Sequence, residues 1–283
     1  MTGMRAYIEQ NAMRALTPTG GFLRGFAYSM NPYTGCAFGD GGGCPYCYVR
    51  ALPVAHARPD AWGKWVIAKT NLPELLEREL AALERNGKLG DATIFMSSAT
   101  DPYQGFERRL SITRRALEAF VRRPPRRLLI QTRSPLIERD IDLIARLGDH
   151  AIASVTLETD DDSVRCAITP TSPAVARRLT TMLRLRAAGI FTQMAVSPML
   201  PNDPQRFAEL AAEVADRVIV DTYFDGDGAN GRRSRALGIG ALYERLGYAE
   251  WFRPGAERDL LAAMRTRLGA DRVLFSRSGF NAV

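Results

Sequence analysis

Strand-like and helix-like segments alternate along most of the chain's 283 residues. Short apolar runs predict strands at 27–34, 93–98, 127–132, 151–159, 190–198 and 217–224. Segments with helical periodicity predict helices at 72–87, 111–123, 135–148, 173–189 and 204–215. Parallel neighbouring strands need such crossover helices, and strands that are apolar throughout are covered on both faces. The alternation therefore predicts an α/β fold, a partial (β/α)6 TIM-like barrel with parallel strands.

We interpret residues 1–283 as a single domain, with a core at about 25–225 and a C-terminal helical extension at about 226–283. No Gly-rich linker, internal repeat or low-complexity tract divides the chain. Helical periodicity at 238–247 and 257–269 predicts that the extension packs on the open side of the barrel. With 46% hydrophobic residues, the chain can bury a large core.

The composition argues against several classes of protein. No run of about 18 apolar residues occurs, and the N-terminal segment lacks the apolar core of a signal peptide. We therefore expect a soluble, cytoplasmic monomer with no membrane contact. The net charge is +7, with arginine pairs at 122–123, 126–127 and 232–233. Such pairs are typical of solvated faces, and the charge permits nucleic acid as a partner without requiring it.

The expected strands end in polar side chains. In barrels of this kind the chemistry lies at the C-terminal ends of the strands. The polar residues there are Ser97, Ser98, Thr100, Asp101, Gln131, Thr132, Glu158, Thr159, Ser197, Asp221, Thr222 and Tyr223. Loops also favour polar residues for purely structural reasons. Because six such ends would meet at one rim, beside a cysteine-rich segment, we predict a functional site at that rim.

Three of the four cysteines, Cys36, Cys44 and Cys47, lie within twelve residues of each other. Four cysteines are too few for a disulfide scaffold, and bunched thiols in a cytosolic protein are typical of metal or redox sites. A structural zinc ion takes four ligands, and His56 is the nearest candidate for the fourth. Three thiolates alone suit a [4Fe–4S] cluster with one iron open to another ligand. Two interpretations follow: an iron–sulfur enzyme, or a non-catalytic zinc-stabilised or nucleic-acid-binding barrel.

Two stretches carry a resemblance to a known family. NPYTGC…CPYCYVR (31–50) and SATDPYQGFE (98–107) resemble the radical S-adenosylmethionine (SAM) superfamily, and within it the branch that contains spore photoproduct lyase. The resemblance covers roughly residues 25–225. It implies an enzyme whose [4Fe–4S] cluster cleaves SAM reductively to a 5′-deoxyadenosyl radical, which abstracts hydrogen from a substrate that the sequence does not identify. It also implies a low-potential electron donor such as a flavodoxin or ferredoxin.

The same resemblance implies roles for individual residues. Cys36, Cys44 and Cys47 would bind iron, and Tyr46 would lie beside the adenine of SAM. The seven residues between Cys36 and Cys44 depart from the three that are usual in the superfamily. Because the inserted residues are mostly glycine, they can loop out without moving the thiols.

Strand-end residues take further roles by resemblance. Ser98 and Thr100 would approach the methionine amino group of SAM. Glu158 would meet the ribose hydroxyls or that amino group, and Ser197 would line the adenine pocket. Each of these residues has an equally good alternative as a structural cap at a strand end.

This chain lacks the thiol that donates a hydrogen atom to the substrate radical in spore photoproduct lyase. Spore photoproduct lyase supplies a donor thiol from the end of its second strand, where this chain has the sequence Ser-Ser-Ala at 97–99. We therefore do not expect the repair reaction in its known form. Tyr48, or Cys166 on a loop after the fourth strand, would have to serve as the catalytic hydrogen source. A free cysteine is otherwise typical of a small buried apolar residue.

Overall fold

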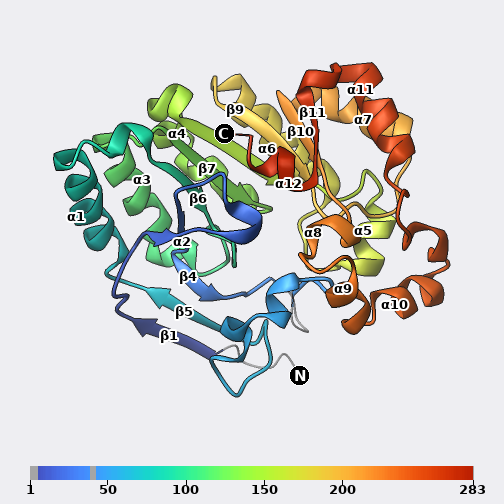
Figure 1. Ribbon diagram of the computed structural model, residues 1–283, viewed down its shortest axis with the longest axis horizontal. Helices are drawn as coiled ribbons and strands as arrows, with labels where there is room; N and C mark the ends of the chain where they lie inside the picture. Colours follow the sequence, from blue (N-terminus) through green and yellow to red (C-terminus); the bar gives the residue numbers. More distant parts are fainter. Residues whose placement is uncertain (1–5, 39–42, 283) are drawn as a thin grey trace.

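The computed structural model describes residues 6–38 and 43–282. Its main sheet has the strand order β11–β10–β9–β8–β7–β6–β3–β2. The strands are β2 (Thr17–Pro18), β3 (Tyr28–Met30), β6 (Thr93–Met96), β7 (Arg127–Thr132), β8 (Ala151–Thr156), β9 (Phe191–Val196), β10 (Arg217–Val220) and β11 (Val273–Phe275). All pair in parallel except β2, which runs antiparallel to β3. The described parts of β2 and β11 do not pair, so the sheet is an open arc (Figure 1). The predicted α/β fold with parallel strands is confirmed.

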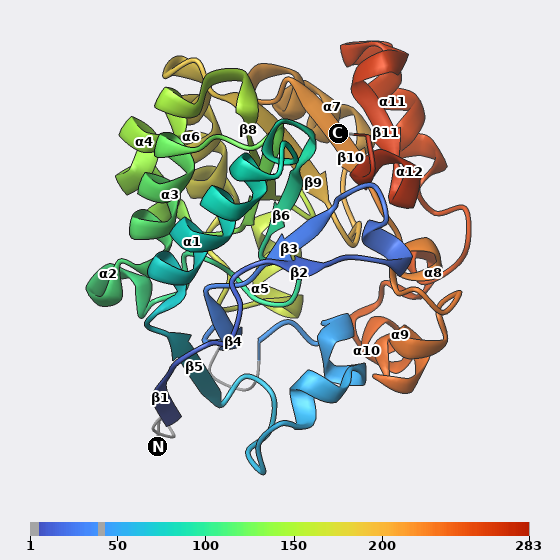
Figure 2. The same ribbon diagram turned by 60° about the vertical axis from the view of Figure 1, so that its left-hand side comes forward.

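Long helices follow the strands in turn and lie along the outer face of the sheet (Figures 1 and 2). They are α1 (Leu72–Arg85), α3 (Ile112–Arg122), α4 (Ile141–Leu147), α6 (Val175–Ala187) and α7 (Pro204–Val214). Shorter helices occupy connections that follow strands: α2 (Glu107–Leu110), α5 (Asp162–Ile168), α8 (Tyr223–Gly226), α9 (Arg232–Ala236) and α10 (Ile239–Leu246). Near the C-terminus, α11 (Arg258–Leu268) packs on α7, and α12 (Ser276–Phe280) follows β11.

Strand residues alternate between two buried faces of the sheet. The inner face carries one layer of apolar side chains: Phe95, Leu129, Ile152, Ala195 and Ile219. Their neighbours in sequence, such as Ile94 and Met96, pack under the outer helices. This double burial explains why the strands are apolar throughout instead of alternating.

The predicted first strand, 27–34, is wrong in its extent. It divides into β3 and β4 (Tyr33–Gly35), which belong to different sheets. Pro32 lies at the division and cannot donate a hydrogen bond to a sheet ladder. In the second sheet β4 pairs antiparallel with β5 (Trp65–Lys69), which pairs in parallel with β1 (Ala6–Gln10). The cysteine-rich segment therefore leaves from a small sheet beside the main one.

The segment after residue 270 closes the gap between the two edges of the main sheet. Strand β11 was not predicted, because the extension was expected to consist of loop and helical segments. The Asn281 side chain donates to the Phe22 carbonyl at 2.8 Å and accepts from the Gly25 amide. The Phe280 and Phe22 rings lie 5.8 Å apart between centroids. The C-terminal segment thus lies at the open side of the sheet, as expected.

Within the described residues, no helix combines the length and the apolar character that crossing a membrane requires.

Candidate functional site

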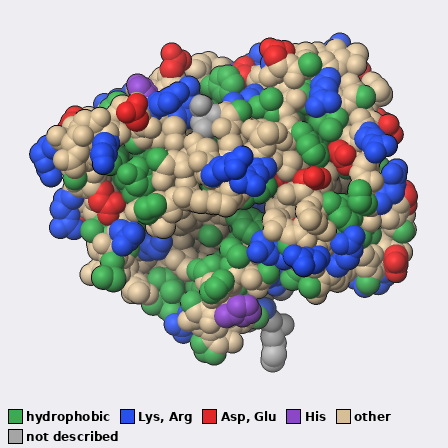
Figure 3. All heavy atoms as spheres, in the orientation of Figure 1, with side chains coloured by type: hydrophobic (Ala, Val, Ile, Leu, Met, Phe, Trp, Pro, Cys, Tyr) green, Lys and Arg blue, Asp and Glu red, His purple; other side chains and the backbone are tan. Residues whose placement is uncertain are grey.

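A cavity of about 550 Å³ lies at the C-terminal ends of the strands. Cys36, Cys44 and Cys47 line it together with every predicted strand-end polar residue except Glu158 and Thr159. In the space-filling view, hydrophobic side chains line a recess near the middle of this face, and basic side chains gather along its edge (Figure 3). The structure therefore brings the cysteine segment and the polar strand ends to one place.

The three thiols are partly buried in the wall of this cavity. Burial, reinforced by the nearby thiols, raises the pKa of Cys36 to about 12, and burial raises that of Cys44 to about 11. A metal-bound thiol gives up its proton, because the positive charge of the metal stabilises the thiolate. Within the described residues, no group of three or more His, Cys, Asp and Glu side chains is arranged around a single-ion position. His56 is exposed at the end of a 3₁₀ turn, Pro53–His56, and does not line the cavity. Among the described residues, the thiols that line the cavity are those of Cys36, Cys44 and Cys47.

Two unpartnered polar atoms also fit a ligand in the cavity. Ser97 Oγ and Gln131 Oε1 are buried in its lining and have no hydrogen-bond partner among the described residues. Ser97 has a φ of 72°, a conformation that residues other than glycine seldom adopt and that is frequent at functional sites. Burying such atoms unpaired costs free energy, which a polar ligand would recover. The cavity volume also lies within the range of about 300–1,000 Å³ that is usual for small-molecule sites. The residues present thus fit a cluster and a SAM-sized ligand.

Residues 98–107 hold the backbone on both sides of Cys36. Thr100 Oγ1 donates to the Gly35 carbonyl at 2.5 Å, and Gln104 Oε1 accepts from the Ala37 amide at 2.9 Å. Gly35 has a φ of +87°, and an added Cβ would lie 2.3 Å from the Trp65 carbonyl oxygen. Only glycine fits there. Thr100 lines the cavity, but its hydroxyl already serves to position the cysteine segment.

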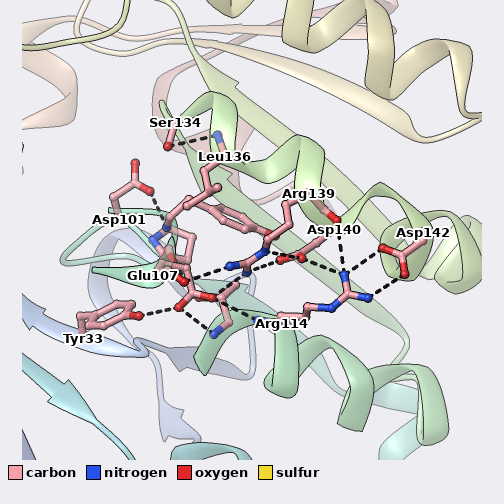
Figure 4. A network of polar contacts seen from close by, with 12 residues as sticks. Tyr33, Asp101, Glu107, Arg114, Ser134, Leu136, Arg139, Asp140 and Asp142 are labelled. Carbon is pink, nitrogen blue, oxygen red and sulfur yellow. Dashed lines mark hydrogen bonds and ion pairs between the residues drawn. The ribbon is translucent and has the colours of Figure 1, made fainter. Parts of the chain in front are cut away.

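A charged network anchors the far end of the same stretch (Figure 4). Glu107 is fully buried, accepts from the Tyr33 hydroxyl, and pairs with Arg139 at 2.7 Å. Tyr33 lies on β4, directly before the cysteine segment, and Arg139 also pairs with Asp140 at 2.8 Å. The sequence SATDPYQGFE (98–107), which carries part of the family resemblance, thus holds the segment around Cys36 in position.

Glu158 lies behind the cavity wall and is 1% exposed. Its carboxylate pairs with Arg178 at 2.6 Å and Arg133 at 3.1 Å, and accepts from the Tyr46 hydroxyl at 2.9 Å. Burial opposes ionisation of Glu158, but the two arginine charges outweigh it and lower its pKa to about 2. The Glu158 carboxylate, which was predicted to meet the ribose hydroxyls or the amino group of SAM, is therefore already bonded to protein donors. Sequence reasoning missed Arg133, whose signal is a basic residue directly after a polar strand end.

The remaining predicted site residues divide into two groups. Tyr46, Tyr48, Ser98 and Ser197 line the cavity, and the Tyr48 hydroxyl donates to the Ser98 carbonyl. Cys166 does not line it. The predicted loop position of Cys166 is wrong, because the residue lies on the helix α5 and is exposed. Its sulfur lies 2.6 Å from an Arg165 nitrogen, away from the cavity.

The seven-residue gap between Cys36 and Cys44 includes residues 39–42, which lie outside the described part of the chain.

Asp221, at the end of β10, is a buried carboxyl group in the cavity wall. Burial raises its pKa to about 6, against hydrogen bonds from Ser276, the Thr222 amide and Ser197. Because the folded-state pKa lies above the unfolded value of 3.8, this group favours folding at low pH, and the contribution disappears as pH rises through 6.

We expect Asp221→Asn to raise the free energy of unfolding of the apoprotein by about 2–3 kcal/mol at pH 8, and to change that free energy little at pH 4, as measured by urea unfolding. A stabilisation of equal size at both pH values would contradict this assignment. Asp142→Asn is the control, because hydrogen bonding to Arg114 lowers the pKa of Asp142 and the sign of the pH dependence reverses.

Comparison with protein families gives a match to the radical SAM superfamily over residues 30–214. An uncharacterized protein of Methanocaldococcus jannaschii is 30% identical over 195 residues, which are 69% of this chain and 68% of that protein. An uncharacterized protein of Acidianus two-tailed virus is 28% identical over 189 residues, covering 63% of this chain and 58% of the relative. An uncharacterized protein of Mycobacterium tuberculosis is 29% identical over 181 residues, covering 62% and 51%. The chain thus spans about half to two thirds of the length of these relatives.

Solved structures of spore photoproduct lyase variants share the fold. One superposes with a TM-score of 0.66 at 12% sequence identity, covering 95% of this chain and 81% of that one. A second, with bound AdoMet and dinucleoside spore photoproduct, gives a TM-score of 0.66 at 13% identity with the same coverage. At this level of identity, the likeness concerns the fold alone.

Proposed function

The chain belongs to the radical SAM superfamily, and on that premise we propose that Cys36, Cys44 and Cys47 hold a [4Fe–4S] cluster beside a SAM-binding cavity. Cluster and SAM together supply a 5′-deoxyadenosyl radical that removes hydrogen from a bound substrate. The observation that supports this proposal most is that the three thiols line one cavity at the strand ends, while His56 is exposed. A low-potential electron donor such as a flavodoxin or ferredoxin is then required.

The chain's own residues would divide the work in the cavity. The three cysteines bind as thiolates and release their protons on loading. Tyr46 packs edge-on against Tyr223, with 6.0 Å between ring centroids, and offers an aromatic wall for the adenine. Ser97 Oγ and Gln131 Oε1 provide hydrogen-bonding groups that none of the described residues uses. Ser98 and Ser197 lie in the same lining, and Glu158 orients the Tyr46 hydroxyl from behind. The enclosing walls keep water away from the reacting atoms.

Tyr48 is the side chain that we propose for hydrogen transfer to or from the substrate. It lines the cavity, and its hydroxyl is held by the Ser98 carbonyl. Cys166 is not proposed for this role, because its thiol faces solvent. One structural neighbour binds a dinucleoside spore photoproduct, but the residues directly after β6 here are Ser-Ser-Ala (97–99) with no cysteine, so we do not propose that lyase's reaction for this chain.

Anaerobic reconstitution tests the proposal. We expect about four irons and four sulfides per chain. The reduced protein should then convert SAM to 5′-deoxyadenosine and methionine, measured by liquid chromatography. One zinc per chain without sulfide would overturn the proposal and favour the zinc-stabilised barrel.

A further inference from the structure

Arg133 follows β7 and directs its guanidinium at one of the three cysteines. Its Nη1 atom lies 2.9 Å from Cys44 Sγ, and it also donates to Ser172 Oγ at 3.0 Å. The side chain is 15% exposed. A hydrogen bond from a charged donor is among the stronger interactions available to a sulfur ligand. Because little water surrounds this buried guanidinium, its charge is only weakly screened at the sulfur atom.

The position of this guanidinium is fixed from two directions. The backbone amide of Arg133 donates to Asp101 at 2.9 Å, which holds the chain at the end of β7. Its guanidinium pairs with Glu158, whose other carboxylate oxygen is held by Arg178 at 2.6 Å. Because Glu158 is itself locked in place, Arg133 has little freedom to turn away from Cys44.

The charges in this group do not cancel. Arg133 and Arg178 are positive, while Glu158 is the single negative partner. Within these three residues one positive charge remains in excess, and the nearest cysteine sulfur is that of Cys44. The arrangement therefore presents a fixed positive field to whatever Cys44 binds.

We propose that Arg133 sets the reduction potential of the bound cluster through its hydrogen bond to Cys44. This inference rests on the proposed function. The potentials of iron–sulfur clusters are set by net charge, hydrogen bonds to sulfur and exposure. Reduction adds one negative charge, so a nearby fixed cation stabilises the reduced state more than the oxidised state. Through its charge, Arg133 thus makes reduction of the cluster by a physiological electron donor easier.

The test is a redox titration of the reconstituted protein without substrate, followed by electron paramagnetic resonance of the reduced cluster. In Arg133→Gln, which keeps hydrogen-bonding capacity but removes the charge, we expect the equilibrium constant for reduction to fall at least tenfold. That fall equals a shift of 59 mV to more negative potential for one electron. Arg133→Lys, which restores the charge, should return most of the shift. Arg115→Gln on the outer helix α3 removes the same charge far from the site and should leave the potential unchanged.

Glu158→Gln is a second test variant, for which we expect a shift of the reduction potential in the opposite direction. It tests the inference even if Arg133→Gln does not fold. Removing the negative partner increases the excess positive charge, so the potential should rise. An unchanged potential in Arg133→Gln with full iron content, or a fall in Glu158→Gln, would overturn the inference. Failure of the unmodified protein to bind iron and sulfide would instead overturn the proposed function, so the two failures are distinguishable.

Discussion

Replacing Cys36, Cys44 or Cys47 by alanine should abolish the cluster and, with it, all cleavage of SAM. In the proposed site each thiolate would hold one iron, and these cysteines are the thiols that line the cavity in the described residues. We expect iron content after anaerobic reconstitution to fall to background in each single variant. Product formation should fall by at least about a thousandfold, because losing the cluster removes the source of the radical.

Cys166→Ala is the matched control for these variants. It removes one thiol of the same chemistry from an exposed position on α5. Iron content and SAM cleavage should stay at the level of the unmodified protein. A full cluster in any of the three alanine variants, or loss of iron in Cys166→Ala, would show that the ligand set is wrong.

Glu107→Ala should cause a large loss of stability. The carboxylate is fully buried, pairs with Arg139 at 2.7 Å, and accepts from the Thr113 amide at 3.1 Å. Its removal leaves the buried Tyr33 hydroxyl and the Thr113 amide without their acceptor, and leaves Arg139 with Asp140 as its remaining carboxylate partner. We expect the free energy of unfolding to fall by about 3–5 kcal/mol in urea.

The matched control is Glu74→Ala, on the surface of α1. Glu74 pairs with Arg115 at 3.5 Å, but both side chains are well exposed. Such pairs contribute about 0–1 kcal/mol. Equal losses in the two variants would mean that the buried network of Figure 4 does not stabilise the fold as its geometry indicates.

The central strands could be predicted from the sequence because their signal is local. For example, 127–132 is an apolar run with both faces buried, and the structure has β7 at those residues. The polar strand ends were also visible, and parallel strands bring their ends to one rim whatever the details of packing. The Pro32 break in the first strand was available as a signal, because proline rarely continues a ladder.

Other features depend on contacts that no local pattern carries. The hydrogen bond from Arg133 to Cys44 joins residues 89 apart in the sequence. The pairing of β1 with β5 joins segments that periodicity treats independently. The family resemblance implies that Glu158, at a predicted strand end, meets SAM, whereas its carboxylate is held by Arg178 from the helix α6. Side-chain direction at a strand end depends on such neighbours, so position alone could not predict it.

The contact between Asn281 and Gly25 also determines when, during synthesis of the chain, the fold can be completed. A ribosome that has made the three clustered cysteines must add more than two hundred further residues before it reaches Asn281. At about 5–20 residues per second, this interval lasts tens of seconds. During that time Phe280, which belongs to the cavity lining and to the inner core, does not yet exist. The cavity beside the three cysteines is therefore complete only once residues 280 and 281 have been made, and a cluster proposed to bind there would meet an unfinished wall before that point.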